Sequence, residues 1–413
     1  MAGYNSTGGG KVSFVSAVPL SASGVAGRGL PLSGRRHFCT GASRLRLGGH
    51  VARVVSASRP PLRAPCMAIY LPETLNQWIL QQERVHPESA ELAPLLTAIA
   101  TAGKQIASLV ARAGVSNLTG LQGDGGSINV QGEEQKKLDV LTNEVLKNAL
   151  RSTGRLGVLA SEEEDEPVSL MEESFAGHYI ACFDPLDGSS NVDAAIATGT
   201  IFGVSRSNSS CLTGPDGDPV SPRDMQCMIQ TLQPGANLVA AGYILYSSSV
   251  VMMLSMGRGV QGFSLDPAIG EFVLTHPDVK IPRRGKIYSF NEANSGNWDT
   301  VLQAYVQRMK HNGYSSRYIG SLVGDVHRTL LYGGVFGYPA DKKNPRGKLR
   351  LLYECAPMAF LMEQAGGVAT TGSQRVLDVI PSQVHQREPL ICGSADDVQD
   401  LLDMYAEAHA AKV

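Results

Sequence analysis

The sequence predicts a layered α/β protein, a five-layer sandwich in the order αβαβα. Apolar runs of strand length crowd the middle of the chain, and in the C-terminal half such runs alternate with helical patterns. Helices that alternate with strands bury their apolar stripes on the faces of sheets, so this alternation predicts stacked layers. No uninterrupted apolar run approaches the ~20 residues of a membrane span, so we expect no membrane partner.

The first elements after the N-terminal segment are predicted to be helical. An apolar stripe indicates an amphipathic helix over residues 90–113, which Gly114 closes. The stripe consists of Leu92, Leu95, Leu96, Ile99, Ile106, Leu109 and Val110. A glycine-rich loop at 121–132 follows, and then a second helix at 136–150.

The next block is predicted to be rich in strands, and the last part to alternate strands with helices. Expected strands lie at 157–160, 179–183, 200–205 and 238–246, and a hairpin at 262–274 with Asp266-Pro267 and Gly270 in its turn. Further strands are expected at 286–291, 335–338 and 389–393. Helices are expected at 298–311, 321–332, 355–365 and from residue 396 onward.

The N-terminal segment differs in composition from the rest of the chain. Residues 1–72 contain no Asp or Glu, but eight Arg and one Lys among many Ser, Gly and Ala residues. This composition is typical of an organelle transit peptide, which is disordered before import. We therefore expect residues 1–66 to be a disordered transit peptide, with cleavage between Ala57 and Ala68.

Removal of that segment leaves an acidic protein. The full chain has 36 Lys and Arg against 38 Asp and Glu, so loss of the nine basic residues leaves 27 against 38. A formal charge of −11 makes a poor nucleic-acid binder, and we expect no nucleic-acid partner. If the ligand carries phosphate, metal ions and a few local cations must recruit it.

The most informative stretch is 184–191, which reads DPLDGSSN directly after an apolar run. Pro185 disfavours helical geometry at Asp184, so the chain is expected to leave the sheet there in a turn. Gly188 lets the backbone approach a ligand, and the following amides can face an anion at a helix start. Carboxylates for hard cations beside amides for phosphate indicate metal-assisted phosphoryl chemistry. A solvated acidic turn is the alternative.

A second acidic group, residues 162–166, follows the apolar run 157–161. An isolated acidic run is more often a solvated loop. Both acidic groups here follow short apolar runs, and ligands gather at strand ends in layered α/β folds. Divalent ions between the two ends would explain why so many like charges are tolerated together.

Four motifs together resemble the fructose-1,6-bisphosphatase family, of the lithium-sensitive, magnesium-dependent phosphatase superfamily. They are DPLDGSSN at 184–191, Glu162-Glu163 after Ser161, KKLDV at 136–140 and KLRLLYE at 348–354. The resemblance runs from about Thr74 to about Ala410. It implies a five-layer αβαβα sandwich of the sugar phosphatase type. It also implies an N-terminal metal and 1-phosphate part at 73–270 and a C-terminal sugar and 6-phosphate part at 271–413.

The resemblance implies up to three Mg²⁺ ions per subunit and a set of site residues. The metal ligands would be Glu133, Glu162, Asp184, the Leu186 carbonyl oxygen, Asp187 and Glu354. Glu163 and Asp139 would activate the attacking water. The 1-phosphate would bind near Asp187, Gly188, Ser189 and Ser190. The 6-phosphate and sugar would bind Asn291, Arg317, Tyr318, Tyr338 and Lys348. Glu133 stands where the family more often has Asp.

The resemblance also raises expectations about assembly and control. In the family the arginine at Arg317 reaches a neighbouring subunit, which implies a homo-oligomer, normally a tetramer. AMP inhibition is expected to be weak, because Ala93 and His178 replace polar contacts of the family's AMP site. The insertion at 208–227 contains Cys211 and Cys227, which would form a thioredoxin-sensitive disulfide in the chloroplast stroma; two unremarkable thiols are the alternative.

The activity implied is hydrolysis of the 1-phosphate of fructose 1,6-bisphosphate, which yields fructose 6-phosphate in the Calvin cycle or plastid gluconeogenic sugar synthesis. Three alternatives stand beside it. Sedoheptulose-1,7-bisphosphatase shares the chemistry but lacks the Lys136-to-Asp139 arrangement. An inositol-phosphate phosphatase would not need Arg317 and Lys348 for a second phosphate. A catalytically inactive regulatory protein would not need the intact carboxylates.

Overall fold

The computed structural model describes residues 72–116, 118–120, 127–128, 134–170, 178–207 and 230–411. The expected transit peptide, Glu133 and the expected redox pair Cys211 and Cys227 lie outside these residues. Residues 69–413 form one compact unit. The division of this unit at residues 270 and 271 therefore stays a prediction.

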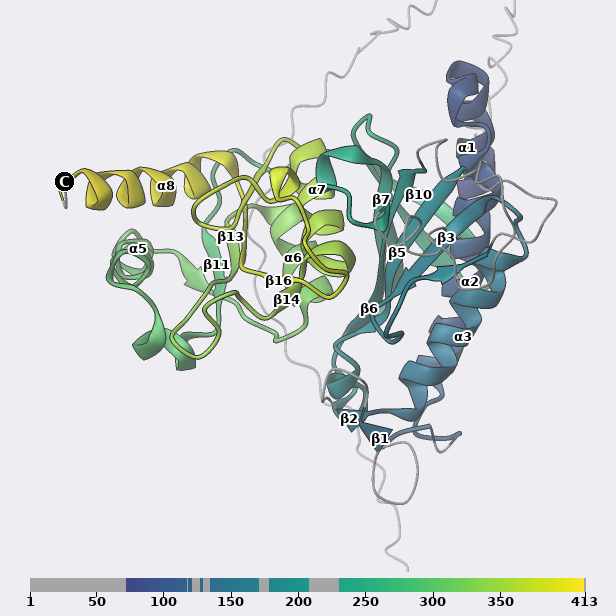
Figure 1. Cartoon of the computed structure of the whole chain (residues 1–413), viewed down its shortest axis with the longest axis horizontal. Helices are drawn as coiled ribbons and strands as arrows, with labels where there is room; N and C mark the ends of the chain where they lie inside the picture. The colour runs from purple at the N-terminus through teal and green to yellow at the C-terminus, as the bar shows by residue number, and fades with distance from the viewer. Residues whose placement is uncertain are drawn as a thin grey trace, which may run out of the picture. The chain divides into compact units, whose positions relative to one another are not determined.

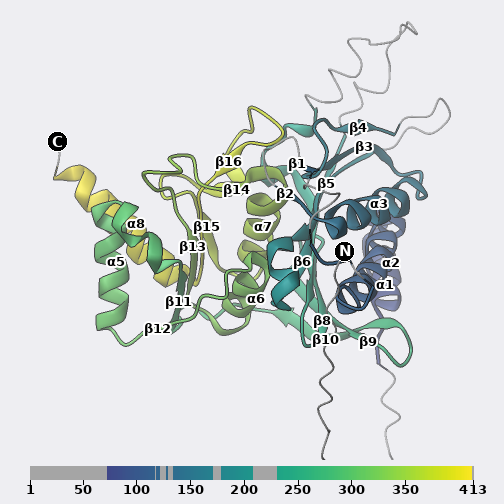
Figure 2. The ribbon, with the colours of Figure 1, turned by 90° about the horizontal axis from the view of Figure 1, so that it is seen from below.

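The first layer consists of three helices on one face of the larger sheet (Figures 1 and 2). These are α1 (Leu75–Val85), α2 (Leu92–Ala111) and α3 (Lys137–Arg151). Helix α2 is, among the described helices, the one long and apolar enough to cross a membrane by length and composition. Half of its residues, including Leu95 and Ile99, are buried in a core shared with the sheet. The predicted stripe on this helix therefore faces a protein core.

The second layer is an eight-stranded sheet, called here the large sheet, in the order β10-β9-β8-β7-β6-β5-β3-β4. Its pairs are antiparallel except for β3 with β5. The strands are β3 (Leu156–Ser161), β4 (Val168–Ser169), β5 (Tyr179–Asp187), β6 (Thr198–Arg206), β7 (Leu238–Tyr246), β8 (Val250–Ser255), β9 (Val260–Asp266) and β10 (Glu271–Val279). The expected strand at 238–246 and the hairpin turn around Gly270 are confirmed.

The expectation that the chain leaves the sheet at Asp184 is wrong. Strand β5 continues to Asp187, and every residue of it is buried. Pairing with β6 shifts register between Asp184 and Asp187, so Pro185 occupies an irregularity in the ladder. A proline lacks the N–H that a regular ladder needs, and a bulge accommodates it without ending the strand.

The remaining three layers continue away from the large sheet. Helices α6 (Leu322–Tyr332) and α7 (Ala356–Gln364) share a core with its second face and with the small sheet. The small sheet has the order β12-β11-β13-β17-β15. Its strands are β11 (Ile287–Phe290), β12 (Ser315–Ser316), β13 (Val335–Tyr338), β15 (Val368–Thr370) and β17 (Leu390–Gly393). Its outer face packs on α5 (Thr300–His311) and α8 (Ala395–Ala410). The order αβαβα is confirmed (Figure 2).

Two short ladders and several 3₁₀ segments complete the described structure. Strand β1 (Ser127–Ile128) pairs with β2 (Glu134–Gln135), and β14 (Leu349–Arg350) pairs with β16 (Arg387–Glu388). The 3₁₀ segments are Pro87–Ser89, Ser189–Ala194, Gly235–Asn237, Glu292–Asn297 and Val376–Asp378. A single turn of π-helix, Leu351–Cys355, leads into α7. This turn and the segment after β5 build the site described below.

Candidate active site

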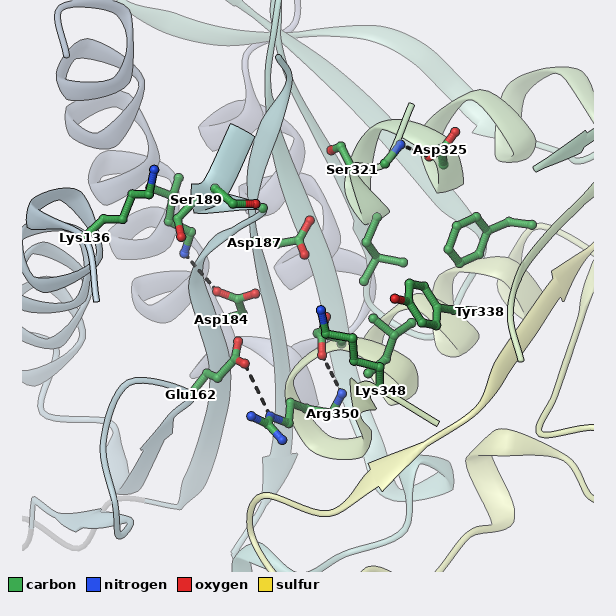
Figure 3. Close-up of a pocket in the computed structure, with 18 of the residues that line it drawn as sticks. Lys136, Glu162, Asp184, Asp187, Ser189, Ser321, Asp325, Tyr338, Lys348 and Arg350 are labelled. Atoms are coloured by element: carbon green, nitrogen blue, oxygen red, sulfur yellow. Dashed lines mark hydrogen bonds and ion pairs between the residues drawn. The ribbon is translucent and has the colours of Figure 1, made fainter. Parts of the chain in front are cut away.

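A cavity of about 590 Å³ opens between the end of β5, the start of α6 and the π-helical turn before α7. Figure 3 shows side chains from both halves of the chain pointing into it. The site residues expected from the sequence that line it are Glu162, Glu163, Asp184, Leu186, Asp187, Gly188, Ser189, Ser190, Tyr318, Tyr338, Lys348 and Glu354. The fold therefore brings residues nearly 200 positions apart into one hollow.

Three buried carboxylates lie close together in the lining of this cavity. Asp184, Asp187 and Glu354 each offer an oxygen, and these oxygens lie within 4.8 Å of one another. Strand β5 supplies the two aspartates, and the π-helical turn supplies Glu354. Oxygen atoms at this spacing suit one small divalent ion, since Mg²⁺ binds oxygen ligands at about 2.0–2.1 Å.

Burial and mutual repulsion disfavour the charged forms of these carboxylates. Burial, together with the charge of Glu162, raises the pKa of Asp184 and of Glu354 well above their ordinary values. Burial raises the pKa of Asp187 to about 7, although its Oδ2 accepts a hydrogen bond from the Val323 amide at 3.3 Å. A divalent ion would stabilise the charged forms that burial disfavours. The donor set therefore fits magnesium.

Arg350 lies against the acidic group and was not expected as a site residue. Its side chain is buried, and its Nε lies 3.4 Å from Glu162 Oε1. Its backbone N–H donates to Glu354 Oε2 at 2.5 Å (Figure 3). The signal was present in the motif at 348–354, where a basic residue stands four positions before Glu354. Arg350 supplies a fixed positive charge beside the expected metal ligands.

Asp139 sits in the first turn of α3 and does not line the cavity. Its Oδ2 accepts a hydrogen bond from the Lys136 amide at 2.9 Å. Its Oδ1 is buried, and the side chain of Ser189, which lines the cavity, interacts with this carboxyl group. Burial raises the pKa of Asp139 to about 6, against the opposing effect of the Lys136 hydrogen bond. A carboxylate with this pKa can accept a proton near neutral pH.

The segment after β5 forms a turn that presents two serines to the cavity. Gly188 has φ +74°, in the left-handed region that glycine adopts without strain. A short 3₁₀ helix, Ser189–Ala194, follows, and the Asn191 amide donates to the Gly188 carbonyl at 2.8 Å. Ser189 and Ser190 line the cavity beside Lys136. Hydroxyl and lysine donors beside buried carboxylates suit a phosphate that is held by metal and protein together.

The far wall of the cavity holds some, but not all, of the residues expected at the 6-phosphate. Tyr318, Tyr338 and Lys348 line it. Asn291 does not; it borders a separate small hollow, which Tyr338 also borders. Arg317 is exposed and does not line the cavity, and its guanidinium donates to the Ser316 carbonyl at 2.9 Å. The structure therefore separates Asn291 and Arg317 from the other expected contacts.

Asp325 is a second residue of the cavity that the sequence analysis did not single out. It is fully buried in α6 and accepts hydrogen bonds from the Ile319 and Gly320 amides, each at 3.0 Å. An acidic residue on the buried side of an expected amphipathic helix was the available signal. The cavity is also lined by Lys136, Gly320, Ser321, Leu322, Phe336 and Leu349.

Two family models together match most of the chain. A family model described as fructose-1-6-bisphosphatase, N-terminal domain, matches residues 73–277, and its C-terminal counterpart matches residues 281–406. Chloroplastic fructose-1,6-bisphosphatase from Spinacia oleracea is 56% identical over 337 residues, which cover 80% of each chain. Chloroplastic fructose-1,6-bisphosphatase 1 from Arabidopsis thaliana is 50% identical over 384 residues, 91% of this chain and 89% of the relative.

A solved structure is similar over most of the described fold. The holo form of Leishmania major fructose-1,6-bisphosphatase is 42% identical in sequence and superposes with a TM-score of 0.73. The match covers 81% of this chain and 99% of the solved chain.

Proposed function

The chain belongs to the fructose-1,6-bisphosphatase family, and we propose that its acidic cavity binds magnesium ions and fructose 1,6-bisphosphate together. The enzyme hydrolyses the 1-phosphate, which yields fructose 6-phosphate and phosphate in plastid carbohydrate metabolism. The proposed metal site rests on the cluster of Asp184, Asp187 and Glu354. These three buried carboxylates bring one oxygen each to within 4.8 Å of one another.

We assign the metal ligands from this cluster outward. Asp184, Asp187 and Glu354 would hold one ion, and Glu162 and the Leu186 carbonyl oxygen would extend the set toward a second. Glu133, which lies outside the described residues, would serve a third. When bound, Mg²⁺ neutralises charge on the phosphoryl group and its leaving oxygen and makes a coordinated water more acidic.

The other residues of the site would then bind substrate and move the proton. Ser189 and Ser190 donate to the 1-phosphate, while Tyr318, Tyr338 and Lys348 hold the sugar and the 6-phosphate. Burial raises the pKa of Tyr318 to about 12, so this phenol stays a neutral donor at physiological pH. Asp139 and Glu163 accept the proton of the attacking water, and the pKa of about 6 at Asp139 suits that task.

We further propose a homotetramer in the chloroplast stroma. The exposed position of Arg317 at the edge strand β12 supports a role in a neighbouring subunit's 6-phosphate site. Asn291 would contribute to the 6-phosphate site of its own subunit, where it borders a small hollow together with Tyr338. Regulation by thioredoxin would act through Cys211 and Cys227.

Phosphate release from fructose 1,6-bisphosphate by the purified chain tests the proposal. With magnesium we expect rapid release, and a chelator in excess should abolish it. Phosphorus NMR of the product should show fructose 6-phosphate, because only the 1-phosphate faces the metal cluster in the proposed arrangement. Equal rates with and without magnesium, or release of the 6-phosphate, would refute it. Sedoheptulose 1,7-bisphosphate in the same assay tests the disfavoured alternative.

A further inference from the structure

We propose that two hydrogen bonds to Gly320 fix the distance between the two phosphate ends of the cavity. Asn191 binds the carbonyl oxygen of Gly320, and Asp325 binds its N–H. Gly320 with these two contacts is called the node below. This inference rests on the proposed function, since it concerns the length of the bisphosphate that the site accepts. Asn191 and Asp325 are positioning residues in this account. Neither belongs to the set of residues assigned above to metal, proton transfer or substrate.

Both backbone polar atoms of Gly320 are engaged. Its N–H donates to Asp325 Oδ2 at 3.0 Å, and its carbonyl oxygen accepts from Asn191 Nδ2 at 3.0 Å. The glycine itself has φ +83°, which places it in the left-handed region. A residue with a side chain would be strained there, so the node depends on glycine.

The two partners of the node belong to the two ends of the site. Asn191 is in the 3₁₀ segment that carries Ser189 and Ser190. Its backbone N–H donates to the Gly188 carbonyl, and its own carbonyl oxygen accepts from the Ile196 amide, so both backbone groups are bonded to residues that flank the segment. Its side chain therefore extends from a fixed base. Its contact with Gly320 joins residues 129 positions apart in the chain.

Asp325 anchors the other end. Its carboxylate is fully buried and also accepts from the Ile319 amide and from Arg328 Nη2. The same Arg328 nitrogen donates to the Arg317 carbonyl oxygen at 2.7 Å. The loop 317–320, which carries Tyr318 into the cavity, is thus bonded along its backbone to one buried acid and its arginine. A buried acceptor with several charge-assisted hydrogen bonds holds backbone closely.

The node therefore links the segment expected at the 1-phosphate to the loop expected at the 6-phosphate. A sugar bisphosphate must bind the 1-phosphate segment and the 6-phosphate loop at the same time. The distance between these two parts therefore determines how long a bisphosphate the site accepts. A loose link would let the two segments move apart and admit a longer ketose bisphosphate. It would also weaken the hold on the correct one, because ordering the loop would then cost binding energy.

Asn191→Ala, Asp325→Asn and the double variant test the node, with Asn312→Ala as a matched control on the exposed C-terminus of α5. The readout is the ratio of kcat/KM for fructose 1,6-bisphosphate to that for sedoheptulose 1,7-bisphosphate, one carbon longer. We expect each single variant to lower this ratio about tenfold, mainly through KM for the shorter substrate. The double variant should lower it no further than the worse single variant, since both act on one link. The control should keep the wild-type ratio.

An unchanged ratio in Asn191→Ala, with the protein folded by circular dichroism, would overturn the node, as would additive effects in the double variant. A purely structural role would lower the melting temperature but leave the ratio unchanged. Failure of the wild-type chain to hydrolyse fructose 1,6-bisphosphate at all would instead refute the proposed function. The two failures are therefore distinguishable.

Discussion

The buried carboxyl group of Asp187, proposed above as a metal ligand, destabilises the metal-free fold when it is charged. Its pKa rises from 3.8 to about 7 in the folded chain, chiefly through burial. The folded chain thus binds the proton more tightly than the unfolded chain. Proton binding to Asp187 therefore adds to the free energy of unfolding. This contribution is fully present below pH 3.8 and is lost as the pH rises through about 7. In the absence of metal, the charged carboxylate therefore destabilises the fold at alkaline pH.

Asp187→Asn should raise the melting temperature of the metal-free protein at pH 8. The neutral amide removes the cost of burying a charge, which is on the order of 4 kcal/mol for a pKa raised from 3.8 to about 7. The difference from wild type should shrink as the pH falls toward 4, where the wild-type carboxyl is protonated. Magnesium should stabilise the wild type but not the variant. Calorimetric melting curves across pH check this; a less stable variant at pH 8 would contradict it.

Asp139→Asn should lower kcat by roughly 10²–10⁴-fold, the usual contribution of a general base. The KM for fructose 1,6-bisphosphate should change little, because Asp139 is assigned to the proton of the attacking water and not to a substrate contact. Steady-state kinetics measure both, and Asp403→Asn on the exposed side of α8 serves as the matched control. A normal kcat in the Asp139 variant would remove this residue from the proton transfer.

At the scale of elements, local patterns predicted long segments well and short ones poorly. The stripe of α2 and the run 238–246 identify a helix and a strand directly. Helix α1 was missed, although Thr74 and Gln77 form a capping box that marks its start. The two- and three-residue strands β4, β12, β14, β15 and β16 have no pattern of their own. Their ladders depend on neighbours that only the tertiary fold supplies.

The same distinction holds for the site. Carboxylates at the ends of apolar runs were predicted from local sequence, because β5 and β3 deliver them to one edge of a sheet. The family resemblance supplied Glu354, Tyr318, Tyr338 and Lys348. Asp325 was not predicted, since its partners are backbone amides of a loop whose conformation the sequence does not reveal.

Gly188→Ala tests the turn after β5. The alanine must adopt φ +74°, which costs about 1–2 kcal/mol, and its Cβ would stand 3.3 Å from Asn191 Nδ2. We expect a lower melting temperature and a raised KM for fructose 1,6-bisphosphate. Gly296→Ala is the matched control, because its Cβ would meet nothing within 4 Å. Equal KM values in the two variants would show that the turn does not position the 1-phosphate.

At the scale of the whole molecule, the cavity exists only because the layers stack. One wall comes from the large sheet and the segments that follow its strands, and the other from α6, β13 and the π-helical turn. The insertion 208–227, which lies between β6 and β7 in the sequence, is proposed above to regulate this site through Cys211 and Cys227.

Oxidised and reduced protein should differ in activity if Cys211 and Cys227 form a regulatory disulfide. A disulfide over a loop of this size would stabilise its closed form by about 3 kcal/mol in the chain-entropy model. We expect a dithiol to raise the rate of the oxidised wild type. The Cys211→Ser/Cys227→Ser variant should be fully active without reductant. Equal wild-type rates before and after reduction would contradict the redox proposal.

Calorimetric titration of the full chain with Mg²⁺, in the presence of fructose 6-phosphate and phosphate, tests the central claim most directly. Wild type should bind the metal with release of protons, since the pKa values of its carboxyl ligands are raised. Asp187→Ala in one half of the chain and Glu354→Gln in the other should each abolish binding at the same site. Undiminished binding in either variant would contradict a shared metal cluster.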